Sequence, residues 1–367
     1  MKTPPPIWLK SGVAIGAGHP CFIVAEIGNN HQGEFDIARR MIEVAAETGI
    51  QAVKFQKRDI DALFTRAGRD APYTGANSFG RTYGEHRRAL ELTIDQMARL
   101  KEIAENLGMV FFFSAWDRVS MVQLLDMDVE LIKICSADMV NIPLLRQAGE
   151  SGLPVILSTG MSELEDVDTA VNELASFHKE IVLLQCNGSY PCPDDQVGLA
   201  VIAELRKRYG LNAGYSGHER GLGASVAAAA LGACVIERHF TLDKTMRGTD
   251  HQASLTPAEF KALVKMVREV EAGLKNQRKQ TFAGEREVAK KLRKSIFFAR
   301  DLPAGHILTE EDLAVKCPGT GVSPVHWREI IGASLLGSAR HDEPFSWEMI
   351  AAAPQVRRGV SLGAGRF

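Results

Sequence analysis

The stretches Gly214-Tyr215-Ser216-Gly217-His218 and Val235-Ile236-Glu237-Arg238-His239 are short, largely apolar runs that each end on a histidine. Enough chain separates the two histidines for one helix, so the pattern predicts two successive strands of a strand–helix repeat. Parallel strands that follow one another in such a repeat end on the same side of the sheet. The two imidazoles are therefore expected to lie side by side at the mouths of adjacent strands.

The strand–helix rhythm extends outward from this pair over most of the chain. Eight strand-like runs alternate with segments whose apolar residues recur at helical spacing. The runs cover residues 22–27, 52–55, 109–113, 131–135, 154–157, 181–185, 213–215 and 234–237. Eight such units favour a closed (β/α)8 barrel, the TIM barrel, over an open sheet. An open doubly wound sheet is the alternative, but no Gly-x-Gly-x-x-Gly pattern follows the first run to support it.

The composition allows a large core and argues against highly charged partners. The 367 residues are 45% apolar, and their formal net charge of -2 would attract neither nucleic acid nor an anionic membrane. No run approaches the length of a membrane span, and the N-terminus lacks the apolar centre of a signal peptide. The six cysteines form no Cys-x-x-Cys, which favours reduced thiols over a disulfide framework. We therefore expect a soluble, cytoplasmic protein with no nucleic-acid or membrane partner.

Changes in composition divide the chain into four parts. Residues 1–275 are predicted to form the barrel, and 276–294 read as a basic, polar linker. Residues 295–351 show short strand-like pieces and turns typical of a small mixed domain, and 352–367 are expected to be a flexible tail. Within the barrel, the segment 57–93 is too long for an ordinary connection, so we expect it to lie at the mouth, either as a lid or as a disordered loop.

Two lysines lie inside apolar runs that are expected to be strands. Lys54 and Lys133 must either reach the barrel mouth or be buried and paired. Ser136, Ser158 and Ser216 occupy the ends of nearby runs. Ammonium groups and hydroxyls gathered in one place would cradle a phosphate or a carboxylate.

The histidine pair predicts a labile divalent ion. His218 and His239 suit an ion held by neutral imidazoles, with positions left for water or substrate, although two hydrogen-bonded core histidines are the alternative. No dense Cys/His cluster indicates a closed zinc site, so Mn²⁺, Mg²⁺ or Co²⁺ acting as a Lewis acid is favoured. Glu26 and Asp138, at two further strand ends, are candidate acid/base groups or structural hydrogen-bonding carboxylates.

Five motifs in order resemble the sialic acid synthase family, over about residues 20–350. They are Val24-Ala25-Glu26-Ile27-Gly28-Asn29-Asn30-His31, Val53-Lys54-Phe55-Gln56, Leu157-Ser158-Thr159-Gly160-Met161, Tyr215-Ser216-Gly217-His218 and Glu237-Arg238-His239-Phe240. The resemblance implies a barrel followed by a small antifreeze-like (SAF, β-clip) domain. It also implies a domain-swapped homodimer in which the small domain of one subunit covers the barrel mouth of the other.

The resemblance further implies substrates, a metal and residue roles. The substrates would be phosphoenolpyruvate and an amino sugar or hexose of the N-acylmannosamine type, and the metal at His218 and His239 would be Mn²⁺ above Mg²⁺ or Co²⁺. The implied catalytic set is Glu26, Lys54, Asp138, His218 and His239. The implied substrate-binding set is Gln56, Ser114, Lys133, Ser136, Ser158, Asn187, Tyr190, Ser216 and Asp250.

Some positions depart from the common family pattern. Gly188 stands where many bacterial members have Asn, and Cys317 stands where members that use free N-acetylmannosamine often carry Arg. A thiol cannot supply the charged hydrogen bond of that arginine to the N-acyl group. Other segments resemble animal-type enzymes that take the 6-phosphate sugar, for which the arginines Arg81, Arg87 and Arg88 could serve.

The sequence thus predicts an N-acetylneuraminate (sialic acid) synthase, which joins phosphoenolpyruvate to N-acetylmannosamine or a related sugar and releases phosphate. Within this class, the product could instead be the 9-phosphate, a deaminated (KDN-type), a legionaminic or a pseudaminic acid. Another barrel that condenses phosphoenolpyruvate with a phosphorylated aldose is a second hypothesis. A non-catalytic carbohydrate-binding barrel is the third, and the presence of Lys54, Lys133, His218 and His239 argues against it.

Overall fold

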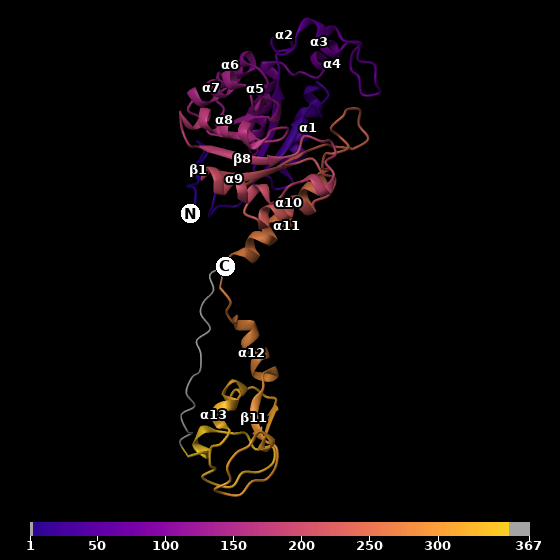
Figure 1. The fold of residues 1–367 in the computed structure, drawn as a ribbon. Helices are drawn as coiled ribbons and strands as arrows, with labels where there is room; N and C mark the ends of the chain where they lie inside the picture. Colours follow the sequence, from indigo (N-terminus) through magenta and orange to yellow (C-terminus); the bar gives the residue numbers. More distant parts are fainter. Residues whose placement is uncertain (1–2, 277, 352–367) are drawn as a thin grey trace. The chain divides into compact units, whose positions relative to one another are not determined.

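The computed structural model describes residues 3–276 and 278–351, and its first unit is a closed barrel of parallel strands (Figure 1). The strands follow one another around the barrel in sequence order, and the last pairs with the first. They are β3 (Phe22–Gly28), β4 (Ala52–Lys57), β5 (Val110–Ala115), β6 (Ile132–Ile134), β7 (Val155–Ser158), β8 (Ile181–Cys186), β9 (Asn212–Gly217) and β10 (Val235–His239). The TIM-barrel prediction is confirmed, and the open doubly wound sheet is wrong.

Helices between the strands cover the outside of the barrel. They are α1 (Phe35–Ala46), α5 (Ile94–Asn106), α6 (Arg118–Leu125), α7 (Ile142–Glu150), α8 (Leu164–Ala175), α9 (Val201–Tyr209), α10 (Gly223–Ala230) and α11 (Pro257–Leu274). Helix α1 turns Met41, Ile42 and Ala45 inward, as its apolar spacing requires. Thr93 and Thr256 begin α5 and α11 with capping boxes that satisfy the first backbone N–H groups. Single 3₁₀ turns lie at Ser136–Asp138 and Asp194–Gln196.

Alternate strand residues point into the barrel, and their character changes along its axis. The inward positions near the strand starts form a buried apolar cluster that includes Phe22, Val24, Ala52, Val110, Phe112, Leu131, Ile156, Val182, Leu184 and Val235. Two residues further along their strands, Val24 and Ala52 are followed by Glu26 and Lys54. Charged side chains therefore lie one layer above an apolar floor.

A short hairpin near the N-terminus closes the floor. Its strands β1 (Ile7–Trp8) and β2 (Ala14–Ile15) pair antiparallel. Ile7, Leu9 and Ile15 belong to the same apolar cluster as the inward residues at the strand starts. Water is therefore excluded from the floor, and the barrel interior can open only at the carboxyl ends of the strands.

The segment 57–93, predicted as a lid or a disordered loop, has secondary structure of its own. It contains α2 (Ile60–Leu63), α3 (Arg66–Asp70) and α4 (Tyr83–Ala89), which group together beyond one end of the barrel (Figure 1). Tyr73, between α3 and α4, packs on His86 of α4 with their ring centroids 4.5 Å apart. Packing of this kind can hold side chains of the segment at defined positions.

The chain divides into two compact units between Lys275 and Asn276. The segment 276–294, predicted as a linker, carries the helix α12 (Ala283–Leu292), which the sequence analysis missed. None of the α12 residues is buried.

The second unit has a small apolar core of its own. Its strands β11 (Ser295–Phe298) and β12 (Leu313–Lys316) pair antiparallel, and a short helix α13 (Trp327–Ile330) follows. Phe298 and Phe345 are buried in this core. Single 3₁₀ turns lie at Glu310–Asp312, Pro324–His326 and Trp347–Met349. The tail predicted at 352–367 lies outside the described residues.

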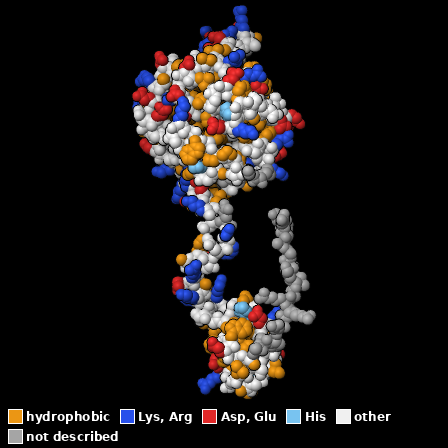
Figure 2. All heavy atoms as spheres, turned by 90° about the vertical axis from the view of Figure 1, so that its left-hand side faces the viewer, with side chains coloured by type: hydrophobic (Ala, Val, Ile, Leu, Met, Phe, Trp, Pro, Cys, Tyr) orange, Lys and Arg blue, Asp and Glu red, His pale blue; other side chains and the backbone are white. Residues whose placement is uncertain are grey.

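The surface of the barrel unit carries both signs of charge. Figure 2 shows Lys and Arg interspersed with Asp and Glu over the face in view, in line with the small net charge of the chain. This face has no single-sign field of the kind that attracts nucleic acid. None of the helices in the described ranges has the length and apolar character needed to cross a membrane.

Candidate active site

A layer of buried charges lies at the mouth end of the barrel interior. The register places His239 beside Glu26 and Glu26 beside Lys54 on neighbouring strands. Lys54 Nζ lies 2.7 Å from Glu26 Oε2 and 3.7 Å from Glu237 Oε1. Lys133 Nζ lies 3.8 Å from the same Glu237 oxygen. Two ammonium groups thus share one carboxylate inside the barrel.

Opposite charges in this layer keep one another ionised. Burial alone would lower the pKa of the Lys54 ammonium, but Glu237 and Glu26 outweigh it and the pKa lies above its ordinary value. Burial alone would raise the pKa of the Glu237 carboxyl, but Lys133 and Lys54 outweigh it and the pKa lies below its ordinary value. Both groups therefore remain charged at neutral pH.

Serine hydroxyls surround the two lysines. Lys54 Nζ donates to Ser114 Oγ at 3.2 Å, and Lys133 Nζ donates to Ser158 Oγ at 2.8 Å. Ser216 Oγ donates to Glu237 Oε1 at 3.2 Å. Ammonium groups and hydroxyls are the donors that phosphate and carboxylate oxygens accept from, so the layer has the chemistry of an anion site.

Ser136 lies at the rim of this layer. Its Oγ accepts a hydrogen bond from the Gly160 backbone N–H at 3.0 Å, which links the turn after β6 to the turn after β7. A Cβ at residue 160 would lie 2.8 Å from that Oγ, so only glycine permits the approach. Two of the sequence-predicted binding segments are therefore in contact.

His218 and His239 lie together at the barrel mouth, as the spacing of their strands predicts. The ring centroids of His218 and His239 are 5.4 Å apart. Tyr190 stacks on His218 with a centroid separation of 3.9 Å, and its hydroxyl lies 3.5 Å from His239 Nε2. Asp250 Oδ2 lies 3.8 Å from His239 Nδ1. Four predicted site residues, three on loops and His239 at the end of β10, thus converge at one point.

The two imidazoles fit a divalent ion. His218 Nδ1 lies 2.6 Å from the Asn187 carbonyl oxygen, an orienting contact that leaves its other ring nitrogen for a ligand. Burial, helped by His239, lowers the pKa of His218 to about 3, so this ring is neutral at pH 7. His239 Nδ1 is buried and has no hydrogen-bond partner among the described residues.

The protein ligands for such an ion are few. In the described part of the chain, no group of three or more His, Cys, Asp and Glu side chains is arranged to hold a metal. An ion on His218 and His239 would need further oxygen ligands from water or substrate, which is typical of a labile catalytic site rather than a closed structural one.

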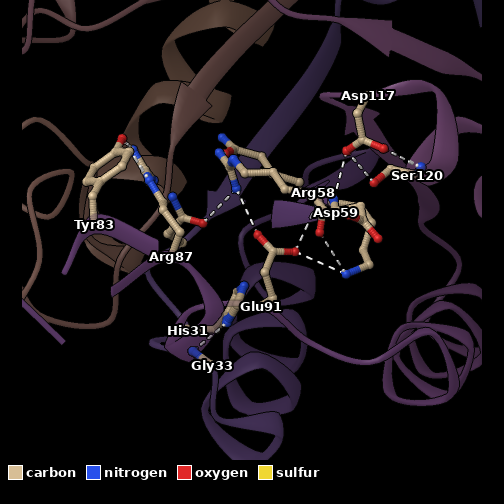
Figure 3. Close-up of polar contacts among 12 residues, drawn as sticks. His31, Gly33, Arg58, Asp59, Tyr83, Arg87, Glu91, Asp117 and Ser120 are labelled. Carbon is tan, nitrogen blue, oxygen red and sulfur yellow. Dashed lines mark hydrogen bonds and ion pairs between the residues drawn. The ribbon is translucent and has the colours of Figure 1, made fainter. Parts of the chain in front are cut away.

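A second polar group links the mouth to the lid. Gln56 Nε2 donates to Glu26 Oε1 at 2.5 Å, and Gln56 Oε1 accepts from Arg58. Arg58 also bonds Glu91 Oε1 at 3.2 Å (Figure 3). Its guanidinium lies 4.2 Å above the Trp116 ring centroid. Glu91, near the end of the segment 57–93, thereby fixes the position of Arg58, which directly follows β4.

Two predicted side chains do not join the central groups. Asp138 accepts from Asn141 Nδ2 at 2.9 Å and from Cys135 Sγ at 3.3 Å, both within its own turn. Burial raises the pKa of Asp138. The Asn187 side chain bonds Gln196 O at 3.0 Å, so it is the backbone of Asn187 that contacts His218.

Comparison with known proteins shows the family to which the chain belongs. The model of the NeuB family matches residues 41–279, and that of the SAF domain matches residues 293–351. The chain belongs to the NeuB family. The resemblance predicted from the five motifs is confirmed, and so is the SAF identity of the second unit.

Curated relatives of this NeuB-family chain match it over nearly its whole length. The human protein named N-acetylneuraminate-9-phosphate synthase is 40% identical over 93% of this chain and 96% of its own length. The Legionella pneumophila protein named N,N'-diacetyllegionaminic acid synthase is 35% identical over 92% of this chain and 96% of its own. The relatives are synthases, and the chain is an enzyme of this kind.

A solved structure agrees with the fold. The N-acetylneuraminic acid synthetase of Leptospira borgpetersenii, solved with citrate, is 32% identical and superposes with a TM-score of 0.69. The match covers 78% of this chain and 95% of that one.

Three residues of the candidate site, Glu237, Arg58 and Glu91, were not predicted from the sequence. Glu237 could have been found from the period of two, because it shares the inward face of β10 with His239. Arg58 and Glu91 could not, because they are far apart in the sequence and only the fold of the lid joins them.

Proposed function

We propose that the chain condenses phosphoenolpyruvate with an open-chain aldose of the N-acylmannosamine type to form a nonulosonic acid. C3 of phosphoenolpyruvate would attack the sugar aldehyde, water would add at C2, and phosphate would leave with cleavage of the C–O bond. One observation carries the proposal: the shared Lys54–Glu237–Lys133 charge group and the His218–His239 pair lie at the same end of the barrel.

The lysines would bind the phosphate and carboxylate of phosphoenolpyruvate. Lys54 and Lys133 are already ordered by Glu237, so they need no reorganisation when an anion arrives. Ser114, Ser158, Ser136 and Ser216 would exchange their present partners for the anion's oxygens. Charge that develops on the leaving phosphate would then face ammonium groups in a site closed to water from below.

His218 and His239 would hold a divalent ion, for which we propose Mn²⁺ ahead of Mg²⁺ or Co²⁺. When bound, such an ion supplies a Lewis acid that polarises the sugar aldehyde. Tyr190 covers one face of His218 and would orient the sugar there.

Carboxylates at the rim would contact the sugar and assist proton transfer. Glu26 is oriented by Lys54 and Gln56, and Asp250 lies next to His239. We also propose that Asp138 assists proton transfer. Burial raises the pKa of its carboxyl, which therefore takes up a proton more readily than an exposed carboxyl does.

The exact sugar separates several products. Free N-acetylmannosamine would give N-acetylneuraminate, its 6-phosphate would give the 9-phosphate, and other sugars would give the KDN-type, legionaminic or pseudaminic acids. The name of the human relative supports the 9-phosphate, and the name of the Legionella relative supports a legionaminic acid. Cys317 argues against free N-acetylmannosamine as the substrate, since a thiol cannot supply the charged hydrogen bond of an arginine.

We also propose a homodimer in which the SAF domain of one subunit covers the barrel mouth of its partner. Family membership supports this arrangement. Light scattering on the full chain should give the mass of two chains, and a monomer at micromolar concentration would contradict it.

A cytoplasmic location is a further proposal. The cysteines of the described ranges are free thiols, and four of them (Cys21, Cys186, Cys192 and Cys234) are buried. Reduced buried thiols are typical of a reducing compartment. Fractionation of the source cells would test it, and recovery in a membrane or secreted fraction would contradict it.

Phosphate release from phosphoenolpyruvate tests the proposed reaction. The full chain with Mn²⁺ would be assayed with N-acetylmannosamine, its 6-phosphate, mannose and a 2,4-diacetamido-2,4,6-trideoxyhexose, each beside an EDTA control. We expect EDTA-sensitive release with one sugar and a product heavier than that sugar by one pyruvate unit. Release without any sugar, or no release with all of them, would contradict the proposal.

A further inference from the structure

A buried ion pair lies behind the barrel wall, one residue away in the chain from each of the two histidines. Arg238 directly precedes His239 at the end of β10, and Glu219 directly follows His218 after β9. Because side chains alternate along a strand, Arg238 points away from the barrel interior into which Glu237 and His239 project. Its Nη1 lies 2.5 Å from Glu219 Oε1, and both side chains are closed to solvent. Neither residue can therefore touch a substrate in the mouth.

The backbone ladder between β9 and β10 ends before it reaches the histidines. Its last register pair is Gly217 with Arg238. His218 lies beyond the end of β9, and His239 pairs with β3 on its other side. Backbone pairing of these two strands therefore does not set the distance between the two imidazoles. The ion pair joins the two segments beyond the ladder, since Glu219 lies two residues past Gly217.

The Arg238 guanidinium holds the turn that follows His218. Its Nη1 also contacts Gly221 O at 2.9 Å and Ser225 Oγ at 2.8 Å. Its Nη2 donates to the backbone carbonyl oxygen of Glu219. Ser225 belongs to α10, which packs on both strands. One side chain of β10 thus fixes the backbone of residues 219–221 and the first turn of α10.

Both oxygens of the Glu219 carboxylate are also bonded. Its Oε2 accepts from the Tyr215 hydroxyl at 2.7 Å, and its Oε1 accepts from Ser225 Oγ at 3.2 Å. A Cβ at residue 217 would lie 2.5 Å from Oε2, so only glycine lets the carboxylate fold back beneath the end of β9. The protein therefore leaves this carboxylate a single position.

Such a pair is a poor source of stability. Desolvation of two buried charges offsets their attraction, and apolar side chains of similar volume would stabilise the wall at least as well. The pair does define geometry, because a planar guanidinium that bonds a carboxylate and two backbone carbonyls at once has one orientation. Its position next to both histidines indicates what that geometry serves.

We propose that Arg238 and Glu219 are positioning residues that set the distance and orientation of the His218 and His239 imidazoles for a divalent ion. The inference rests on the metal site of the proposed function. The Asn187 carbonyl oxygen orients the His218 ring directly, 2.6 Å from Nδ1, and the ion pair fixes the backbone that carries the ring. A change at Arg238 should therefore alter metal binding although this side chain never touches the ion.

Mn²⁺ affinity of the full chain without substrate tests the inference. Free Mn²⁺ would be counted by electron paramagnetic resonance in titrations of wild type, Arg238→Lys, Ser225→Ala and Arg268→Lys. Arg238→Lys keeps the charge but loses the planar fork, and its Kd should rise about 10- to 100-fold, as for loss of an outer-shell partner. Ser225→Ala removes one contact of the network within an alanine-rich helix and should raise Kd about threefold.

Arg268→Lys is the matched control. Arg268 also pairs with a carboxylate and bonds the backbone beside a strand, through Glu271 Oε2 at 2.9 Å and Cys21 O at 3.0 Å. These contacts lie just ahead of β3, at the floor end of the barrel. The Kd of this variant for Mn²⁺ should equal that of wild type. A rise as large as in Arg238→Lys would overturn the inference, because any loosened wall would then have the same effect.

Phosphoenolpyruvate binding separates positioning from a general loss of structure. Lys54 and Lys133 lie on the inward face and are held by Glu237. Calorimetry in EDTA should therefore give Arg238→Lys the wild-type Kd for phosphoenolpyruvate. Loss of both affinities in Arg238→Lys, with wild-type Mn²⁺ affinity in Ser225→Ala, would make the role of Arg238 purely structural and overturn the inference.

The remaining outcomes separate the inference from the proposed function. Wild-type Mn²⁺ affinity in both Arg238→Lys and Ser225→Ala overturns the inference and leaves the metal site standing. If wild type binds no Mn²⁺, the proposed metal site falls, and nuclear magnetic resonance of ¹⁵N-histidine-labelled protein decides the inference. The ring signals of His218, identified by their loss in His218→Ala, should shift in Arg238→Lys and not in Arg268→Lys. Unchanged signals in both variants overturn it.

Discussion

The floor and the mouth of the barrel interior are built from the same strands, yet they have opposite chemistry. At the floor, Val24, Phe112 and Ile156 pack with the N-terminal hairpin in a dry apolar cluster. One layer higher, the ammonium groups of Lys54 and Lys133 lie 2.7 to 3.8 Å from carboxylate oxygens of Glu26 and Glu237. The backbone ladder is continuous through both layers, so the difference lies in the side chains alone.

This difference separates stability from activity. Apolar burial stabilises a fold at about 25 cal/mol per Å². Buried ion pairs roughly break even, because desolvation offsets their attraction, although removing one partner is costly. The floor therefore supplies stability, and the mouth holds charges in place for chemistry. Changes in the floor should consequently affect stability alone, whereas changes in the mouth should affect activity, and stability as well where they leave a buried charge without its partner.

Replacing a mouth histidine should have the largest effect, and on activity alone. His218→Ala removes one of two imidazoles proposed to hold the ion, and a bound ion contributes several kcal/mol to stabilising developing charge. We expect kcat/KM to fall at least about 1000-fold while the thermal unfolding midpoint changes little. Phosphate release and circular dichroism measure the two effects. Full activity in His218→Ala would refute the metal assignment.

Replacing the shared carboxylate should affect both measurements. Glu237→Gln leaves Lys54 and Lys133 buried with one countercharge fewer, so we expect the free energy of unfolding to fall by about 3 kcal/mol. Activity should also fall. The floor control is Ile156→Val, which should cost about 1 kcal/mol with kcat unchanged. Urea unfolding and phosphate release test the pair, and an equal loss of kcat in both variants would remove the distinction between the layers.

A buried histidine near the lid gives a pH test. Burial, helped by Arg58, lowers the pKa of His31 to about 3, against 6.5 for an ordinary histidine. Between these values the unfolded chain binds a proton that the folded chain does not, so stability falls as the pH falls below 6.5. We expect a loss of about 2 kcal/mol between pH 7 and pH 5 that is absent in His31→Asn.

The His31→Asn variant keeps an acceptor for the Gly33 backbone N–H, which His31 Nδ1 accepts at 3.0 Å. The measurement is the urea-unfolding difference between wild type and variant at the two pH values. The same pH slope in both proteins would mean that His31 is not responsible.

The smallest effect should come from an ion pair outside both layers. Lys10 Nζ lies 2.6 Å from Asp128 Oδ1, but both side chains are largely exposed and water screens their attraction. Lys10→Ala should leave the urea midpoint unchanged within error, in contrast to Glu237→Gln. A clear loss of stability would show that this surface contact holds the hairpin over the floor.

Most of the barrel and much of its mouth could be predicted from local patterns. The eight apolar runs matched all the barrel strands to within a residue or two, because strands buried on both faces are nearly continuous apolar stretches. The lid helices were missed because they are short, and α12 was missed because the basic, polar composition of its segment favoured a linker. Asp138 and the Asn187 side chain were assigned from strand ends, where sequence position alone does not give the direction of a side chain.

The sequence by itself determined the family, the order of the barrel strands and the residues that end them, because these depend on residue type and spacing along one chain. Only the tertiary structure decided that Glu237 is shared by two lysines, that Glu91 holds Arg58 and that Arg87, unlike Arg88, contacts no carboxylate among the described residues. Those pairings join segments far apart in the chain. Their geometry follows from closure of the barrel and packing of the lid, which set the distances between charges that no local pattern records.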